Sequence, residues 1–126
     1  MDNNDQKKVL VAEDDKYLAG AYSIKLQKEG FDVKIAYDGE EVFTILQTFT
    51  PDVILLDLVM PVKDGFTTLK ELKQNDLYKN IPVVITSNLS QKDDIDKGMS
   101  LGATDYITKS DYSLKQIIEK ILKYCG

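Results

Sequence analysis

The sequence contains no histidine, no arginine and no tryptophan, and Cys125 is its single cysteine. Without histidine, the chain has no imidazole for acid–base chemistry and cannot form a phosphohistidine of its own. A single thiol excludes an intramolecular disulfide and a metal site built on paired cysteines. All 16 basic residues are lysines, against 21 acidic residues. The net charge of −5 gives no sign of the basic patch that direct nucleic-acid binding usually requires.

Long hydrophobic runs are also absent. No apolar stretch approaches the roughly 18 residues of a membrane span, and no signal-peptide pattern opens the chain. We therefore expect a cytoplasmic protein that does not contact the membrane. The chain has 126 residues, of which 43% are hydrophobic, so one domain with a proper core is expected. Residues 1–6 are polar and are predicted to be a disordered tail, which leaves residues 7–126 for the domain.

Short apolar runs alternate with amphipathic stretches along this domain. The runs at 9–12, 53–56 and 82–85 are continuous, which is typical of strands buried on both faces, and 31–36 and 106–108 read as two further strands. Helical periodicity follows each strand, over residues 16–29, 42–49, 64–72, 91–100 and 113–124. In the fourth of these helices Ile95 and Met99 are expected to face inward. Five strand–helix pairs in strict alternation predict an α/β fold with a doubly wound parallel sheet.

Polar residues end the apolar runs, and in a doubly wound sheet the binding crevice lies at these carboxyl ends. The residues concerned are Glu13, Asp14, Asp15, Asp57, Thr86, Ser87 and Lys109. Clustered carboxylates repel one another unless a hard cation such as Mg²⁺, which prefers oxygen ligands, lies between them. A lysine and a hydroxyl suit phosphate oxygens, and a carboxylate can act as a nucleophile that forms an aspartyl-phosphate. This set therefore predicts phosphoryl transfer.

A family resemblance rests on the same residues. The pair Glu13-Asp14, the segment 57–65, Ser87, Tyr106 and Lys109 occur in this order at the ends of alternating strands. Over residues 7–124 the chain resembles the receiver domain of two-component response regulators, and especially chemotaxis-regulator-like receivers. The resemblance implies a flavodoxin-like (βα)5 three-layer sandwich with strand order 2-1-3-4-5.

The resemblance also implies a role for each residue that would handle the phosphoryl group or a metal ion. Asp57 would accept the phosphoryl group and bind Mg²⁺ (or Mn²⁺). Asp14 would bind the metal directly and Glu13 through water. The backbone carbonyl of Val59 would be a further ligand, and Lys109 would hold a phosphate oxygen.

Two adjacent hydroxyls compete for the switch role. In the family this residue lies five places after the strand-four proline, and counting from Pro82 gives Ser87. By strand alternation, the side chain of Thr86 is then expected to point away from the site. Once the Ser87 hydroxyl moves toward the phosphoryl group, Tyr106 would swing inward.

Two further positions need a choice. The family spacing favours Glu13 and Asp14 as the metal pair, which leaves Asp15 as a helix cap. Ser110 follows Lys109 where the family usually has a proline in a cis peptide. Because a cis bond before a non-proline residue costs roughly 3 kcal/mol, we favour a trans bond here.

The function that follows is a phosphorelay switch, not an enzyme. Its implied partners are a sensor histidine kinase and a downstream target protein, and the chain would be a monomer or a weak phosphorylation-dependent dimer. We favour a stand-alone receiver over one excised from a longer regulator. The alternative is a pseudo-receiver, a constitutive protein-binding module that is never phosphorylated. A hydrolase with an aspartate nucleophile would need a second aspartate at Val59, and a nucleotide or flavin binder would need a first loop without three acids.

Overall fold

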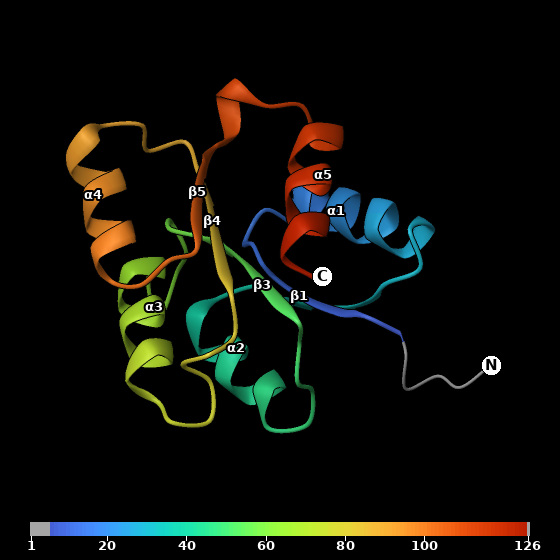
Figure 1. Ribbon diagram of the computed structural model, residues 1–126, viewed down its shortest axis with the longest axis horizontal. Coiled ribbons are helices and arrows are strands. Elements are labelled where there is room, and N and C mark those ends of the chain that lie inside the picture. Colours follow the sequence, from blue (N-terminus) through green and yellow to red (C-terminus); the bar gives the residue numbers. More distant parts are fainter. Residues whose placement is uncertain (1–5, 126) are drawn as a thin grey trace.

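A central sheet lies between two layers of helices (Figure 1). The computed structural model describes residues 6–125. Its strands are β1 (Lys8–Ala12), β2 (Asp32–Ala36), β3 (Val53–Asp57), β4 (Val83–Ser87) and β5 (Asp105–Thr108). Its helices are α1 (Lys16–Lys28), α2 (Gly39–Leu46), α3 (Gly65–Gln74), α4 (Lys92–Ser100) and α5 (Leu114–Tyr124). A 3-10 turn, Lys109–Asp111, separates β5 from α5.

The sheet is parallel throughout, with strand order β2-β1-β3-β4-β5. This order confirms the flavodoxin-like prediction. The chain reverses its winding direction between β1 and β3, and the crevice expected at such a switch point lies at their carboxyl ends. In the register between β3 and β4, Asp57 lies opposite Thr86. Every strand therefore delivers its last residues to the same edge of the sheet.

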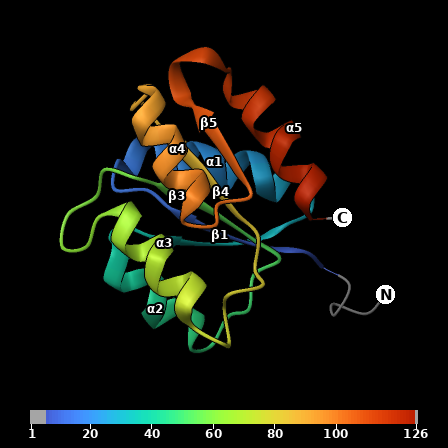
Figure 2. The same ribbon diagram turned by 60° about the vertical axis from the view of Figure 1, so that its left-hand side comes forward.

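The two faces of the sheet carry separate cores. Helices α1 and α5 cover one face, and α2, α3 and α4 cover the other (Figure 2). Alternate residues of each strand point to opposite faces. The α1–α5 core takes Val9, Val11, Val53, Leu55, Val84 and Ile107 from the strands. The core under α2 and α3 takes Leu10, Ala12, Ile54, Leu56, Val83 and Ile85. This alternation, or strand parity, determines to which face of the sheet each side chain at a strand end points.

Short polar side chains start the helices beside the sheet edge. Asp15 accepts a hydrogen bond from the Leu18 amide at 3.1 Å, and Asp64 accepts one from the Thr67 amide at 2.9 Å. Each bond satisfies an amide that has no partner in the first helical turn. The predicted helix cap at Asp15 is confirmed, and α1 starts immediately after the acidic residues that follow β1.

The expectation that Met99 faces inward is wrong. Its side chain is 43% exposed, and Gly98 is the buried residue of α4. A Cβ at residue 98 would lie 2.7 Å from Ile85 Cδ1 and 3.2 Å from the Tyr106 ring. Helix α4 therefore approaches the sheet through a glycine, and this close approach turns Met99, one helical step on, toward solvent. Ile95 is half-buried.

The predicted tail falls almost wholly outside the described residues, which begin at Gln6. Gln6 Nε2 donates to the Gly30 carbonyl at 3.3 Å, so the boundary after residue 6 stays a prediction. Within residues 6–125, none of the helices has the length and apolar character needed to cross a membrane.

Candidate functional site

Three carboxylates meet at the carboxyl ends of β1 and β3. Glu13, Asp14 and Asp57 each offer an oxygen, and these oxygens lie within 4.8 Å of one another. Glu13 and Asp57 are buried, at 2% and 5% exposed, whereas Asp14 is open to solvent. The arrangement gives two shielded acids beneath one accessible acid. These are the acids that the sequence singled out at the two strand ends.

Lys109 brings a positive charge to this cluster from the end of β5. Its Nζ lies 2.6 Å from Glu13 Oε1 and 3.5 Å from Asp57 Oδ1. The Lys109–Ser110 peptide is trans, as is every other peptide bond in the described chain. The prediction of a trans bond is confirmed, and a 3-10 turn starting at Lys109 carries the chain toward α5. The lysine partly neutralises acids that would otherwise repel one another.

Burial shapes the charge of this site. Desolvation raises the pKa of Glu13 from 4.5 to about 7, although the hydrogen bond from Lys109 lowers it. Desolvation also raises the pKa of Asp57, and the positive charge of Lys109 opposes that rise. The raised pKa means that Glu13 keeps its proton to a higher pH than an exposed carboxyl does. A cation that enters the cluster must displace this proton, so metal binding and deprotonation are linked.

The donor set fits a hard divalent cation. Three carboxylate oxygens at short mutual distance are ligands that Mg²⁺ and Mn²⁺ accept. The loop after β3 returns over the same point, because the Val59 amide donates to Asp57 Oδ1 at 3.5 Å. Asp15 stays outside the cluster: its carboxylate caps α1, and its amide donates to Glu13 Oε2 at 3.2 Å. Asp15 therefore helps to hold Glu13 in place.

The two candidate switch hydroxyls lie on opposite faces of the sheet. By strand parity Thr86 shares the α1–α5 face with Val84, and Ser87 shares the other face with Ile85. The same parity places Asp57 on the face of Thr86. Asp57 and Thr86 are partners in the register of β3 with β4, and the expectation that the Thr86 side chain points away from the acidic cluster stays a prediction.

Ser87 and Tyr106 instead lie together on the α4 side. Ser87 is fully buried, and its Oγ accepts a hydrogen bond from the Leu89 amide at 3.0 Å. The Tyr106 hydroxyl donates to the Leu89 carbonyl at 2.5 Å. The Tyr106 ring is thus already half-buried against α4. Both side chains hydrogen-bond Leu89 of the β4–α4 loop.

The helical pattern of the sequence assigned Tyr22 to the core and gave it no other role. Tyr22, on the inner face of α1, is buried. Desolvation by burial raises the pKa of Tyr22 to about 12, and the negative charges of Glu13 and Asp57 add to this rise. The signal in the sequence was a tyrosine among aliphatic core positions, because a buried phenol needs a polar partner.

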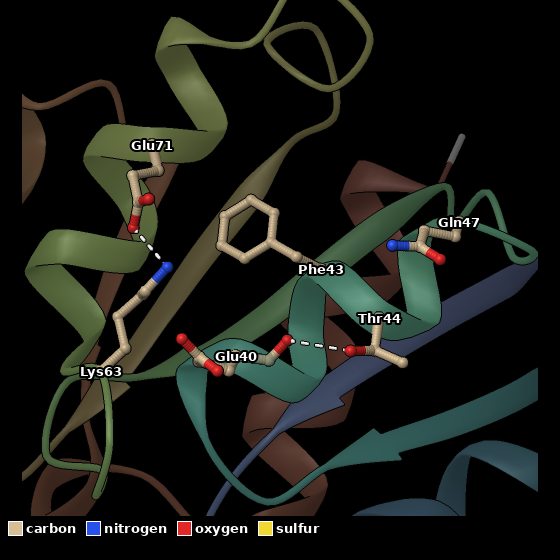
Figure 3. A pocket seen from close by; sticks show the side chains of 6 residues that line it. All are labelled: Glu40, Phe43, Thr44, Gln47, Lys63 and Glu71. Atoms are coloured by element: carbon tan, nitrogen blue, oxygen red, sulfur yellow. Dashed lines mark hydrogen bonds and ion pairs between the residues drawn. The ribbon is translucent and has the colours of Figure 1, made fainter.

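The loop from β3 to α3 is strained beside the acids. Val62 has φ 68°, a left-handed conformation that β-branched residues rarely adopt. The Lys63 amide donates to the Pro61 carbonyl at 2.7 Å, which closes a γ-turn around Val62. Lys63 then reaches into the groove between α2 and α3 (Figure 3). There its Nζ lies 2.8 Å from Glu71 Oε2 and 4.8 Å from the centre of the Phe43 ring.

Comparisons with known proteins agree with this geometry. The sequence profile of the response regulator receiver domain matches residues 9–122. The receiver domain of Francisella response regulator 1452 superposes with a TM-score of 0.86 at 35% identity, covering 95% of this chain and 97% of that one. The chemotaxis response regulator CheY4 of Vibrio cholerae gives 0.86 at 27% identity, covering 94% and 98%. The Mn²⁺-bound form of response regulator Rcp1 gives 0.76 at 31% identity, covering 93% and 90%.

Proposed function

This chain belongs to the response regulator receiver family of two-component systems, and from that premise we propose that it accepts a phosphoryl group on Asp57 from a histidine kinase. The observation that carries the proposal is the position of the Asp57 carboxylate. It is buried at a strand end, with Lys109 Nζ 3.5 Å away and two further acids within 4.8 Å. A carboxylate with a purely structural role would not need two further acids at such a short distance.

The proposed reaction uses the Asp57 carboxylate as the nucleophile. One Asp57 oxygen attacks phosphorus and forms a P–O bond, while the bond from phosphorus to the donor's imidazole nitrogen breaks and the nitrogen leaves with its electron pair. Lys109 is placed to hold an oxygen of the transferred group. Glu13, Asp14, Asp57 and the Val59 carbonyl would hold Mg²⁺ or Mn²⁺, which neutralises charge that develops on the phosphoryl oxygens. Partial burial keeps bulk water away from the acyl-phosphate.

The proposed output is a shift between two arrangements of the β4–α4 loop. The Ser87 hydroxyl would leave Leu89 and turn to the phosphoryl group, which removes one of the two hydrogen bonds that hold this loop. The Tyr106 ring, which already packs against Gly98 of α4, would then turn further inward. A partner that prefers one arrangement then reads phosphorylation as a change in affinity. We propose a downstream target protein as that partner, and a monomer or a weak phosphorylation-dependent dimer as the working form.

Mass spectrometry tests the proposal. The intact protein is incubated with a small acyl phosphate and Mg²⁺, with and without a chelator. We expect the wild type to gain the mass of one phosphoryl group only when Mg²⁺ is present, and Asp57→Ala to gain none. Asp76→Asn, which changes an exposed aspartate paired with Lys79, is the matched control and should gain the group. No gain on the wild type, or an equal gain on Asp57→Ala, would overturn the proposal and leave a constitutive binding module.

A further inference from the structure

The loop that leads from β3 to α3 passes from a buried part to a strained part. Leu58 and Met60 fix its first part, because both are buried in the core under α2 and α3. Val59 lies between them with an exposed side chain, and its backbone carbonyl is the ligand that the proposed function assigns to the metal. Val62 follows with φ 68°, a conformation that persists only where the surrounding structure holds it. The loop therefore needs a second attachment after Val62, and the next residue is Lys63.

The Lys63 side chain contacts both helices that border the groove. From α3, Glu71 Oε2 lies 2.8 Å from Lys63 Nζ, and from α2 the centre of the Phe43 ring lies 4.8 Å from the same atom. The backbone is held as well, because a Cβ at Gly39, the first residue of α2, would overlap the Lys63 carbonyl and lie 2.7 Å from Lys63 Cβ. We call the contacts of Lys63 with Phe43 and Glu71 the Lys63 clasp (Figure 3).

The charges of the clasp depend on one another. Glu71 Oε2 is shielded from solvent, and among residues 6–125 its partner is the Lys63 ammonium, which it meets as an ion pair. A shielded carboxylate oxygen without a cation beside it is unfavourable. Glu40 lines the same groove from α2 and adds a second negative charge. Loss of the Lys63 charge would therefore leave two acids at one groove and free the loop from α3.

We propose that Lys63 is a positioning residue, whose clasp on α2 and α3 holds the strained loop so that the Val59 carbonyl is in place before a divalent cation binds. A ligand group that is already ordered loses less conformational freedom on binding, so the clasp raises metal affinity. Lys63 acts on the site through Val59. This role rests on the proposed function, and it adds a residue that lies outside the acidic cluster.

Substitutions at Lys63 separate this role from packing. Lys63→Met keeps an unbranched side chain beside Phe43 and removes the charge. Lys63→Glu reverses the charge, and Lys63→Glu combined with Glu71→Lys restores an ion pair of opposite direction. Lys79→Met is the matched control, because it removes a lysine from another ion pair, the one with Asp76.

The measurements use the whole chain. Hydrogen exchange of the amides of residues 63 and 65, followed by NMR without metal, reports the order of the loop, because these amides donate to the Pro61 and Leu58 carbonyls. Calorimetry gives the Mn²⁺ affinity without phosphodonor. The rate of mass gain with acyl phosphate is measured over a range of Mg²⁺ concentrations, and urea unfolding gives the stability of each variant.

The clasp predicts a change in metal affinity without a change in the maximal rate. We expect Lys63→Met to exchange both amides faster, to bind Mn²⁺ about threefold more weakly and to reach the wild-type rate at saturating Mg²⁺. Lys63→Glu should weaken Mn²⁺ binding about tenfold, because three acids then line the groove, and the charge-reversed pair should regain most of the affinity. Lys79→Met should match the wild type.

Two results would overturn the inference. One is a Lys63→Met variant that is less stable in urea but keeps wild-type amide exchange and Mn²⁺ affinity, because Lys63 would then serve packing only. The other is a charge-reversed pair that binds Mn²⁺ as weakly as Lys63→Glu, because the ion pair would then not be the cause. If the wild type gains no phosphoryl group, the proposed function fails, while amide exchange and Mn²⁺ affinity still decide whether the clasp orders the loop and the metal site.

Discussion

Ser87 and Tyr106 hydrogen-bond the same residue, Leu89, one at its backbone amide and the other at its backbone carbonyl. Ser87 Oγ accepts the Leu89 amide at 3.0 Å, and the Tyr106 hydroxyl donates to the Leu89 carbonyl at 2.5 Å. A movement of either side chain therefore removes one of the hydrogen bonds that fix the β4–α4 loop. This linkage through Leu89 couples the end of β4 to the surface around Tyr106.

The first prediction concerns that loop. In Ser87→Ala the Leu89 amide loses its acceptor, so it should exchange its hydrogen for deuterium faster than in the wild type, and phosphorylation should no longer change that rate. Hydrogen exchange with mass spectrometry over residues 88–91 measures both effects. Ser90→Ala, an exposed serine of the same loop, is the control. A full phosphorylation-dependent change in Ser87→Ala, together with its loss in Thr86→Ala, would assign the switch to Thr86 instead.

The second prediction concerns pH. Burial raises the pKa of Glu13 from 4.5 to about 7, so between these values the folded state binds more protons than the unfolded state. The contribution of Glu13 to stability is present in full below pH 4.5 and is lost as pH rises through about 7. We expect this loss to reach at most about 3 kcal/mol.

Glu13→Gln removes the titration and provides the measurement. Urea unfolding with a chelator present is followed at several pH values for both proteins. The free energy of unfolding of the wild type minus that of Glu13→Gln should fall as pH rises from 4.5 to 7 and then level off. A difference that does not change with pH would show that Glu13 titrates at its ordinary value.

The third prediction concerns the strained loop. Val62 is 76% exposed and has φ 68°, so Val62→Asn loses no buried surface and places a residue that tolerates the left-handed region. We expect a gain of about 1 kcal/mol in the free energy of unfolding. Val59→Asn, at an exposed valine of the same loop without positive φ, should give no gain. Equal effects of the two substitutions in urea unfolding would remove backbone strain as the cause.

The fourth prediction compares two glycines. A Cβ at residue 65 would overlap the backbone carbonyl of Asp57, whereas a Cβ at Gly20 of α1 would meet no atom within 4 Å. Gly65→Ala should cost about 1–3 kcal/mol and slow phosphorylation, because the loop after Asp57 must move. Gly20→Ala should gain about 1 kcal/mol from helix propensity and leave phosphorylation unchanged. Thermal unfolding and the mass-gain rate report the two effects, and a stabilised, fully active Gly65→Ala would contradict the close approach.

Local patterns determined much of this protein. Short apolar runs, three of them continuous, and helical stripes with period 3.6 identified the five strand–helix pairs, and the rule that polar residues end buried strands located the acids and Lys109. Motif resemblance then supplied the strand order. These signals are local because each is carried by residues a few positions apart. Met99 shows their limit: the distance between α4 and the sheet depends on Gly98 meeting Ile85 and Tyr106, which no helical pattern contains.

Only the tertiary structure decided which side chains meet. Lys109 and Glu13 are 96 positions apart in the chain yet form a 2.6 Å contact. The pairing register of β3 with β4 decided that Asp57 stands opposite Thr86. Tyr22 lies in the core on the α1–α5 face because α1 packs there. The sequence by itself determined which groups reach the crevice. Register and packing, which are cooperative properties of the whole sheet, decided on which face each group lies and what it touches.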